Sequence, residues 1–132
     1  MPILNVTLSS APDAALSAAV AGELSRLTAA LLGKNPQVTA VAVGHVDPAH
    51  WFVAGQRLSE IGKASFFLDT RITDGTNTKD EKAAYVAAVF EAMARLLGPI
   101  HEESYVHVHD VRGDAYGYGG KTQDYRYIAA KV

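Results

Sequence analysis

The residue with the clearest capacity for chemistry is Pro2, which directly follows Met1. Aminopeptidases normally remove a methionine before a small residue, and Pro2 would then carry a free secondary amine. Where apolar side chains and a cation surround such an amine, its charged form is disfavoured and its pKa falls toward neutral pH. Pro2 is therefore a candidate general base and acid. The alternative is a structural proline at the start of a strand, where its missing N–H costs nothing.

Lys34 is the candidate cation because it follows Gly33, the residue at which the first predicted helix ends. An ammonium group close to the Pro2 amine would lower the pKa of that amine. The alternative is a solvated lysine that interacts favourably with the carbonyl groups at the end of the helix.

Polar side chains occupy alternate positions of a strand predicted over residues 104–111. Tyr105, His107 and His109 alternate with two valines and should therefore share one face of a sheet. The two histidines either form ordinary hydrogen bonds on the strand or belong to a wet channel or an active site. A metal site would need further ligands, and the other histidines lack diagnostic spacing, so no metal is expected.

The strand predicted over residues 64–72 divides its side chains in the same way. Most of its apolar residues point to one side, and the opposite side carries Phe67, Asp69 and Arg71. A sheet face with this composition is not a dry core face, which again indicates a wet channel or an active site.

The elements that position these residues are predicted to occur in the same order twice, in pseudo-repeats 2–46 and 64–111. In the first, strand 2–8 precedes a helix whose leucines and valine recur at steps of three and four, and strand 38–46 follows. Ser10 is expected to cap this helix, and Gly33 to end it.

The second pseudo-repeat has a strand, a helix and a strand in the same order. Thr78 and Glu81 form a capping box at the start of the helix, and Gly98 stops it. Because each strand–helix–strand unit forces a parallel, right-handed crossover, both units can share one four-stranded sheet with two helices on one face. The predicted fold class is therefore α+β (or α/β), and a second subunit is expected to cover the bare face.

Two further segments complete the chain, which should form a single domain over residues 1–132. The linker 47–62 contains a short extra strand at residues 51–53, and the Gly- and Tyr-rich arm 112–132 becomes strand-like at residues 125–131.

The amino-acid composition of the chain excludes several classes of protein. The 132 residues are 48% hydrophobic, carry a formal net charge of −2 and include no cysteine. The absence of cysteine excludes a disulfide scaffold and a thiolate nucleophile. The slightly negative net charge does not indicate nucleic-acid binding. The longest apolar stretch, residues 11–32, is Ala-rich and contains charged residues, so no membrane span is predicted. We expect a cytoplasmic protein.

These features together resemble the tautomerase superfamily, in particular its longer-chain members related to macrophage migration inhibitory factor (MIF) and 5-carboxymethyl-2-hydroxymuconate isomerase. The resemblance covers most of the chain and rests on order and spacing rather than on one motif. The segments that carry it are Met1-Pro2, 11–13, 33–37, 47–55, 104–110 and 113–120.

The resemblance implies a homotrimer with inward-facing sheets, no cofactor, and catalysis by Pro2. Lys34 corresponds to a lysine that pairs with a substrate carboxylate or carbonyl oxygen, and Ile72 to a residue whose backbone N–H points at the substrate. Tyr105 corresponds to a tyrosine that reaches the pocket of the adjacent subunit. His107 stands where MIF has an asparagine, a departure at the second polar contact.

The arm and the residues after the third strand bear on two further parts of the site that the resemblance implies. Either Tyr116 or Tyr118 would supply the aromatic wall of the pocket. The decarboxylase and dehalogenase branches carry paired arginines just after the third strand, whereas residues 73–77 here contain none and Arg71 could supply one cation.

We therefore expect a keto–enol tautomerase acting on a small carboxylate-bearing substrate. The alternatives are a decarboxylase or a hydratase/dehalogenase that uses the same proline, and a non-catalytic trimeric module for ligand binding or signalling.

Overall fold

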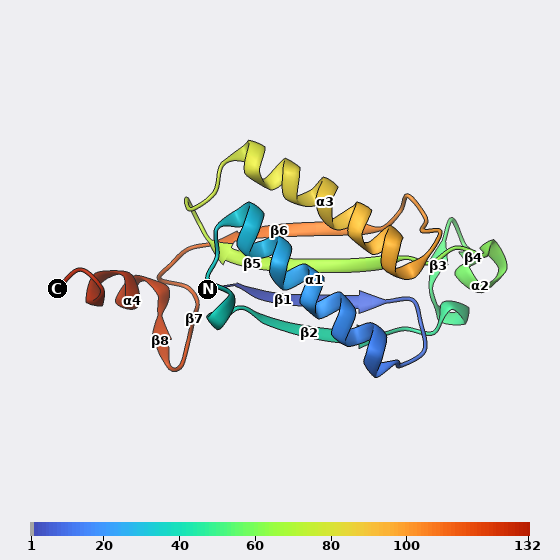
Figure 1. Cartoon of the computed structure of the whole chain (residues 1–132), viewed down its shortest axis with the longest axis horizontal. Helices are drawn as coiled ribbons and strands as arrows, with labels where there is room; N and C mark the ends of the chain where they lie inside the picture. The colour runs from blue at the N-terminus through green and yellow to red at the C-terminus, as the bar shows by residue number, and fades with distance from the viewer. Residues whose placement is uncertain (1) are drawn as a thin grey trace.

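The four main strands form one mixed sheet in the order β2-β1-β5-β6 in the computed structural model, which describes residues 2–132 (Figure 1). Met1, whose removal is predicted, lies outside the described residues. The parallel pairs β1–β2 and β5–β6 meet through the antiparallel pair β1–β5, as expected for two joined strand–helix–strand units. The strands are β1 (Ile3–Leu8), β2 (Ala40–His45), β5 (Phe66–Thr73) and β6 (Tyr105–Val111).

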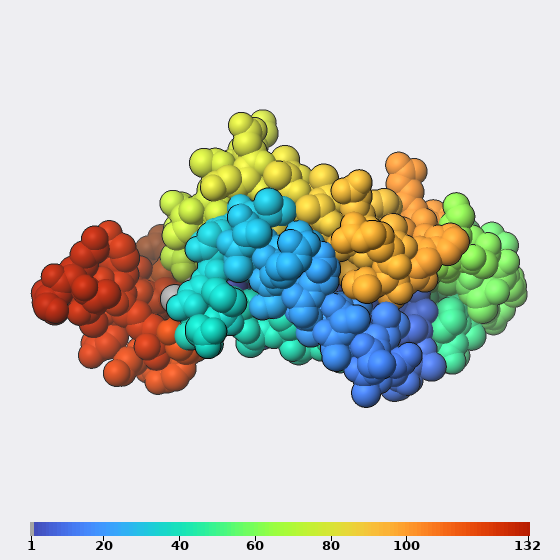
Figure 2. Space-filling view, viewed as in Figure 1, coloured from blue at the N-terminus to red at the C-terminus, as the bar shows by residue number. Residues whose placement is uncertain are grey.

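Both long helices cover the same face of this sheet, as predicted (Figures 1 and 2). Helix α1 (Ala14–Leu32) ends at Gly33, whose φ of 68° is left-handed and suits glycine. The predicted cap at Ser10 is wrong, because the side chain of Asp13 accepts hydrogen bonds from the second and third backbone N–H groups of the helix. Ser10 instead shares a hydrogen bond of 3.2 Å with His45 at the end of β2.

Helix α3 (Lys79–Leu97) begins with the predicted capping box and ends at Gly98. The Thr78 hydroxyl accepts from the Glu81 backbone N–H at 3.1 Å, and the Glu81 carboxylate accepts from the Thr78 N–H at 2.7 Å. Two otherwise unpaired donors are thereby satisfied, which fixes the start of the helix next to the loop that follows β5.

The core lies between the helices and the sheet. By length and composition alone α1 could cross a membrane, but its apolar stripe packs in this core, as in a helix of a globular domain. The fully buried side chains include Leu4, Val6, Leu8, Val20, Leu24, Phe66, Leu68, Ile72, Tyr85, Val89 and Met93.

Tyr85 links three elements inside this core. Its hydroxyl shares hydrogen bonds with Thr28 of α1 at 2.9 Å and with Thr70 of β5 at 3.2 Å, and none of its surface is exposed. Leaving a buried hydroxyl without its hydrogen-bond partner costs roughly 1–3 kcal/mol of folding stability. We therefore expect Tyr85→Phe to lower the free energy of unfolding by about that amount in urea titrations. The matched change Tyr127→Phe, at a side chain 63% exposed, should leave the midpoint unchanged.

The linker forms a small lobe at one end of the sheet. It contains the 3-10 turn η2 (Pro48–His50), β3 (Phe52–Val53), β4 (Gln56–Arg57) and α2 (Leu58–Ile61). A separate 3-10 turn, η1 (Pro36–Val38), precedes β2 at the other end of the sheet. The expected extra strand is present as β3, paired with β4. Strand β2 starts two residues later than predicted, because Asn35 caps the turn that Pro36 begins.

The arm projects from the opposite end of the body (Figures 1 and 2). It folds as a hairpin of β7 (Gly117–Tyr118) and β8 (Lys121–Thr122), followed by helix α4 (Gln123–Ala129). The predicted strand over residues 125–131 is wrong. The Thr122 side chain accepts from the Tyr125 N–H at 3.0 Å and so starts a helix.

Candidate active site

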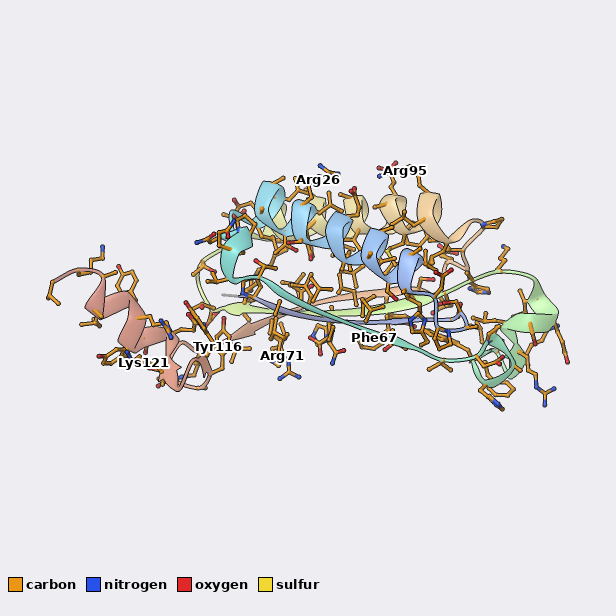
Figure 3. The ribbon with its side chains drawn as sticks, turned by 60° about the horizontal axis from the view of Figure 1, so that its bottom comes forward. Arg26, Phe67, Arg71, Arg95, Tyr116 and Lys121 are labelled. Atoms are coloured by element: carbon orange, nitrogen blue, oxygen red, sulfur yellow. The ribbon has the colours of Figure 1, made fainter. Side chains whose placement is uncertain are left out.

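Pro2 is buried in the wall of a cavity of about 440 Å³ where the first strand meets the arm. The cavity brings together three of the predicted site residues, Pro2, Tyr116 and Tyr118, and Figure 3 shows Tyr116 at the base of the arm. Sequence reasoning missed its other polar residues. The remaining lining residues are Ile3, Gln37, Val38, Thr39, Ala40, Gly117 and Gln123.

The sheet register fixes Pro2 beside Ile72. Ile3 is paired with Arg71 in the antiparallel ladder, so continuing it by one residue sets Pro2 opposite Ile72. The Pro2 carbonyl accepts a hydrogen bond of 3.3 Å from the Ala40 N–H. Ile72 itself is fully buried and is not among the residues that line the cavity.

The arm wall of the cavity is held by backbone geometry that requires glycine. A Cβ at Gly117 would lie 1.9 Å from the carbonyl oxygen of Lys121, which no side chain permits. The hydroxyl of Tyr116 shares a hydrogen bond of 3.0 Å with that of Thr73 at the end of β5. Burial raises the pKa of Tyr116 above its ordinary value, partly offset by this hydrogen bond, so Tyr116 is a neutral phenol at physiological pH.

Lys34 lies behind the arm wall of the cavity and is not among the residues that line it. Its ammonium donates to the Thr76 hydroxyl at 2.8 Å, and Thr76 donates to the carbonyl of Thr73 at 2.6 Å. Burial lowers the pKa of Lys34, while the charges of Glu81 and Asp110 oppose the shift. A partly desolvated cation is therefore connected to Tyr116 through hydrogen bonds of Thr76 and Thr73.

The bare face of the sheet carries the polar rows predicted from alternation, opposite to the helices that bear Arg26 and Arg95 (Figure 3). In the β5–β6 register Arg71 is level with His109, and Asp69 is level with His107. The two histidine rings stack 5.5 Å apart, and Arg71 approaches Asp69 at 3.6 Å. Arg71 and His107 thus lie on this face and do not line the Pro2 cavity.

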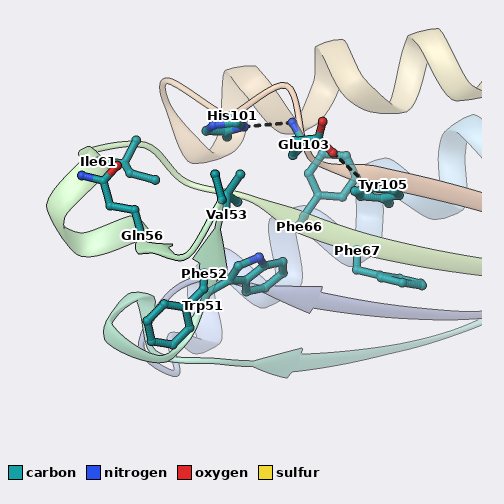
Figure 4. A pocket seen from close by; sticks show the side chains of 11 residues that line it. Trp51, Phe52, Val53, Gln56, Ile61, Phe66, Phe67, His101, Glu103 and Tyr105 are labelled. Atoms are coloured by element: carbon teal, nitrogen blue, oxygen red, sulfur yellow. Dashed lines mark hydrogen bonds between the residues drawn. The ribbon is translucent and has the colours of Figure 1, made fainter.

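Tyr105 lies far from Pro2 within one subunit. It is level with Phe67, five positions from Ile72, or about 17 Å at roughly 3.3 Å per residue. It lines a second cavity of about 780 Å³, formed with Trp51, Phe52 and other residues of the small lobe (Figure 4). Its hydroxyl donates to Glu103 at 2.6 Å, and this hydrogen bond and the carboxylate charge raise its pKa. Tyr105 can meet a Pro2 site only in another copy of the chain.

Among residues 2–132, no group of three or more histidine and carboxylate side chains is arranged to hold a metal ion. The candidate site therefore consists of the Pro2 cavity, with Lys34 behind its wall and with Tyr105 at the far end of the sheet.

No family model matches the sequence, and no curated protein matches it either. Solved structures match over nearly the whole chain. A fused 4-OT in a symmetric trimer has a TM-score of 0.78 and 23% identity over 92% of this chain and 96% of that chain. The MIF-like protein of Entamoeba histolytica has a TM-score of 0.75 and 19% identity, over 92% and 97%. Pt0534 inactivated by 2-oxo-3-pentynoate has a TM-score of 0.80 and 15% identity, over 94% and 98%.

The chain therefore has the fold of the tautomerase superfamily. Within that fold it takes the long-chain, MIF-like form, in which a single chain carries both strand–helix–strand units. The predicted resemblance is confirmed at the level of the fold. The roles assigned to individual residues remain predictions.

Proposed function

We propose that the protein is a cofactor-independent tautomerase that interconverts the keto and enol forms of a small carboxylate-bearing compound. The observation that carries this proposal is the burial of Pro2 in the wall of a cavity that fits a small molecule. A free amine at that position would be desolvated, its pKa would fall, and it would be a base at neutral pH.

In this mechanism the Pro2 nitrogen takes a proton from the enol hydroxyl or from an α-carbon and returns it to the other position. Negative charge then develops on the carbonyl oxygen, and fixed N–H or O–H donors stabilise it. The backbone N–H of Ile72 is one candidate donor, because the sheet register sets Ile72 opposite Pro2. The ammonium of Lys34 now donates a hydrogen bond to Thr76. In the mechanism it would approach the substrate and offset the negative charge of the substrate carboxylate.

A homotrimer would complete the site. Tyr105 is 57% exposed and lies at the end of the sheet opposite to Pro2, so a neighbouring copy must supply it. The fused 4-OT structure that matches this chain is a trimer. In a ring of copies, each Pro2 cavity would receive the Tyr105 hydroxyl of the next subunit.

The decarboxylase and hydratase alternatives receive less support from the cavity. None of the described residues that line it carries an ionised side chain. Arg71, the one cation considered for such a clamp, approaches Asp69 on the bare face instead. Proton transfer needs no pair of cations, so tautomerisation is the better fit.

Chemical labelling tests the proposal directly. Pt0534 is inactivated by 2-oxo-3-pentynoate, a conjugated alkynyl ketone. Here the Pro2 amine should add to the alkyne, forming one N–C bond while the amine proton ends on the neighbouring carbon. Peptide mass spectrometry should then find one probe molecule on the peptide that starts with Pro2. Labelling elsewhere, or none although Met1 has been removed, would contradict the mechanism.

Lys34→Ala should mostly raise KM, because the ground state and the transition state lose the same contact with the substrate carboxylate. It should also move the pH–rate inflection upward, since removing a cation favours the protonated amine and raises the pKa of Pro2. Steady-state kinetics across pH measure both effects. Lys63→Ala, at an exposed lysine just after the linker, is the matched control. An unchanged KM and inflection in Lys34→Ala would remove Lys34 from the site.

A further inference from the structure

One polar group in the Pro2 cavity has no hydrogen-bond partner in the part of the chain that the structure describes. Gln123, the first residue of α4, is only 8% exposed and lines the cavity. Its side-chain nitrogen Nε2 is buried and forms no hydrogen bond within residues 2–132. Because a buried amide donor without a partner is unfavourable, its presence at a cavity wall indicates that a ligand supplies the acceptor.

The fold of the arm holds this side chain in place. The Gln123 backbone N–H donates to the carbonyl of Tyr116 at 3.0 Å, and the Asp124 N–H donates to that of Gly113 at 3.0 Å. A Cβ at Gly113 would lie 2.2 Å from an Asp124 carboxylate oxygen, so a side chain there would displace that carboxylate. The first turn of α4 is thereby pinned against the strand of the arm that carries the aromatic wall.

Two other polar groups of the cavity do not provide an equivalent donor. The Tyr116 hydroxyl is engaged with Thr73, and Gln37 is exposed to solvent. The lining is otherwise largely apolar and, among the described residues, uncharged. A neutral N–H donor in such surroundings is suited to an oxygen that is neutral in the ground state and gains charge during the reaction.

We propose that Gln123 binds the reacting carbonyl oxygen of the substrate and stabilises it as an enolate. This inference rests on the proposed function and adds to it one side-chain donor, placed at the carbonyl oxygen of the enolisable substrate. Pro2 takes the proton from the α-carbon, the C–H electron pair becomes the C=C bond, and the C=O π pair moves onto the oxygen. The Gln123 Nε2–H group donates a hydrogen bond to that oxygen, and the protonated Pro2 amine then passes its proton to the oxygen, which gives the enol.

The test compares Gln123→Met, which keeps the length of the side chain but removes the donor, with the wild type on an enolisable 2-oxo acid. We expect kcat/KM to fall about 10- to 100-fold, mainly through kcat, because the contact strengthens as charge develops. Gln123→Glu, which keeps the shape but replaces the donor with an acceptor, should lose at least as much at neutral pH. Tyr127→Phe, on the exposed side of α4, is the matched control and should retain wild-type kinetics.

The probe 2-oxo-3-pentynoate separates the two hypotheses. If the wild type is labelled at Pro2 and either Gln123 variant keeps wild-type kcat/KM, this inference fails and the proposed function stands. If the wild-type protein with a free Pro2 amine is not labelled at Pro2, the proposed function itself fails. Normal labelling of the wild type, with slower labelling and turnover of both variants, is the result that supports the role of Gln123.

Discussion

A protein that retains Met1, or that carries one added residue before Pro2, should lose tautomerase activity by a factor of about 10²–10⁴, the usual contribution of one positioned acid/base group. Acylation turns the Pro2 amine into an amide, which can neither accept nor return a proton at neutral pH. Initial rates of enol–keto conversion, paired with the intact mass of each preparation, measure the effect.

Pro2→Ala tests the same group without extending the chain. It keeps a primary amine but changes basicity and orientation, so most activity should disappear while the unfolding midpoint stays near that of the wild type. Pro12→Ala, at an exposed proline before α1, is the matched control and should remain active. Full activity in a preparation whose mass includes Met1 would decide against Pro2 catalysis. An inactive natural protein with Met1 retained would favour the alternative of a non-catalytic module.

Phe67→Asp should convert trimers into monomers and abolish activity with them. Phe67 is 43% exposed on the bare face of the sheet, in the same cross-strand row as Tyr105. If that face is the trimer interface, the substitution buries three carboxylates without partners, which is strongly unfavourable. Light scattering coupled to size-exclusion chromatography, at micromolar concentration, gives the mass of the assembly.

Val86→Asp provides the control for this experiment. Val86 is exposed to nearly the same extent, 40%, but lies on α3 at the opposite face of the molecule. That variant should remain trimeric and active. A monomeric wild-type protein would remove the basis for the interface, and a trimeric Phe67→Asp would move the interface elsewhere.

The elements were predictable where local chemistry determines them. The capping box at Thr78, the left-handed Gly33 and the alternation along β5 and β6 are all patterns of neighbouring residues, and the structure contains each of them. The helix α4 was missed because Tyr125, Tyr127 and Ile128 favour strands in isolation. The signal that could have revealed it is Thr122, a capping residue followed by Asp124 in the first turn.

The site was predictable only in part, because its wall is assembled from distant segments. Pro2 was identified from its unusual chemistry, and the tail tyrosines from resemblance. The polar lining residues Gln37, Thr39 and Gln123 have no distinctive spacing in sequence, and they meet only through the sheet register and the fold of the arm. Likewise, the distance of Tyr105 from Pro2 depends on pairing in β5–β6, which no local pattern encodes.

The joining of two strand–helix–strand units in one chain limits how many reactive groups an assembly can hold. The second unit begins at Phe66, in the middle of the polypeptide, so its first residue is an internal amide and not an amine. The larger cavity lies at that end, lined by Phe66 and Phe67. If Pro2 acts as proposed, a ring of three such chains would contain three proton-transfer centres and three equivalent strand ends without one.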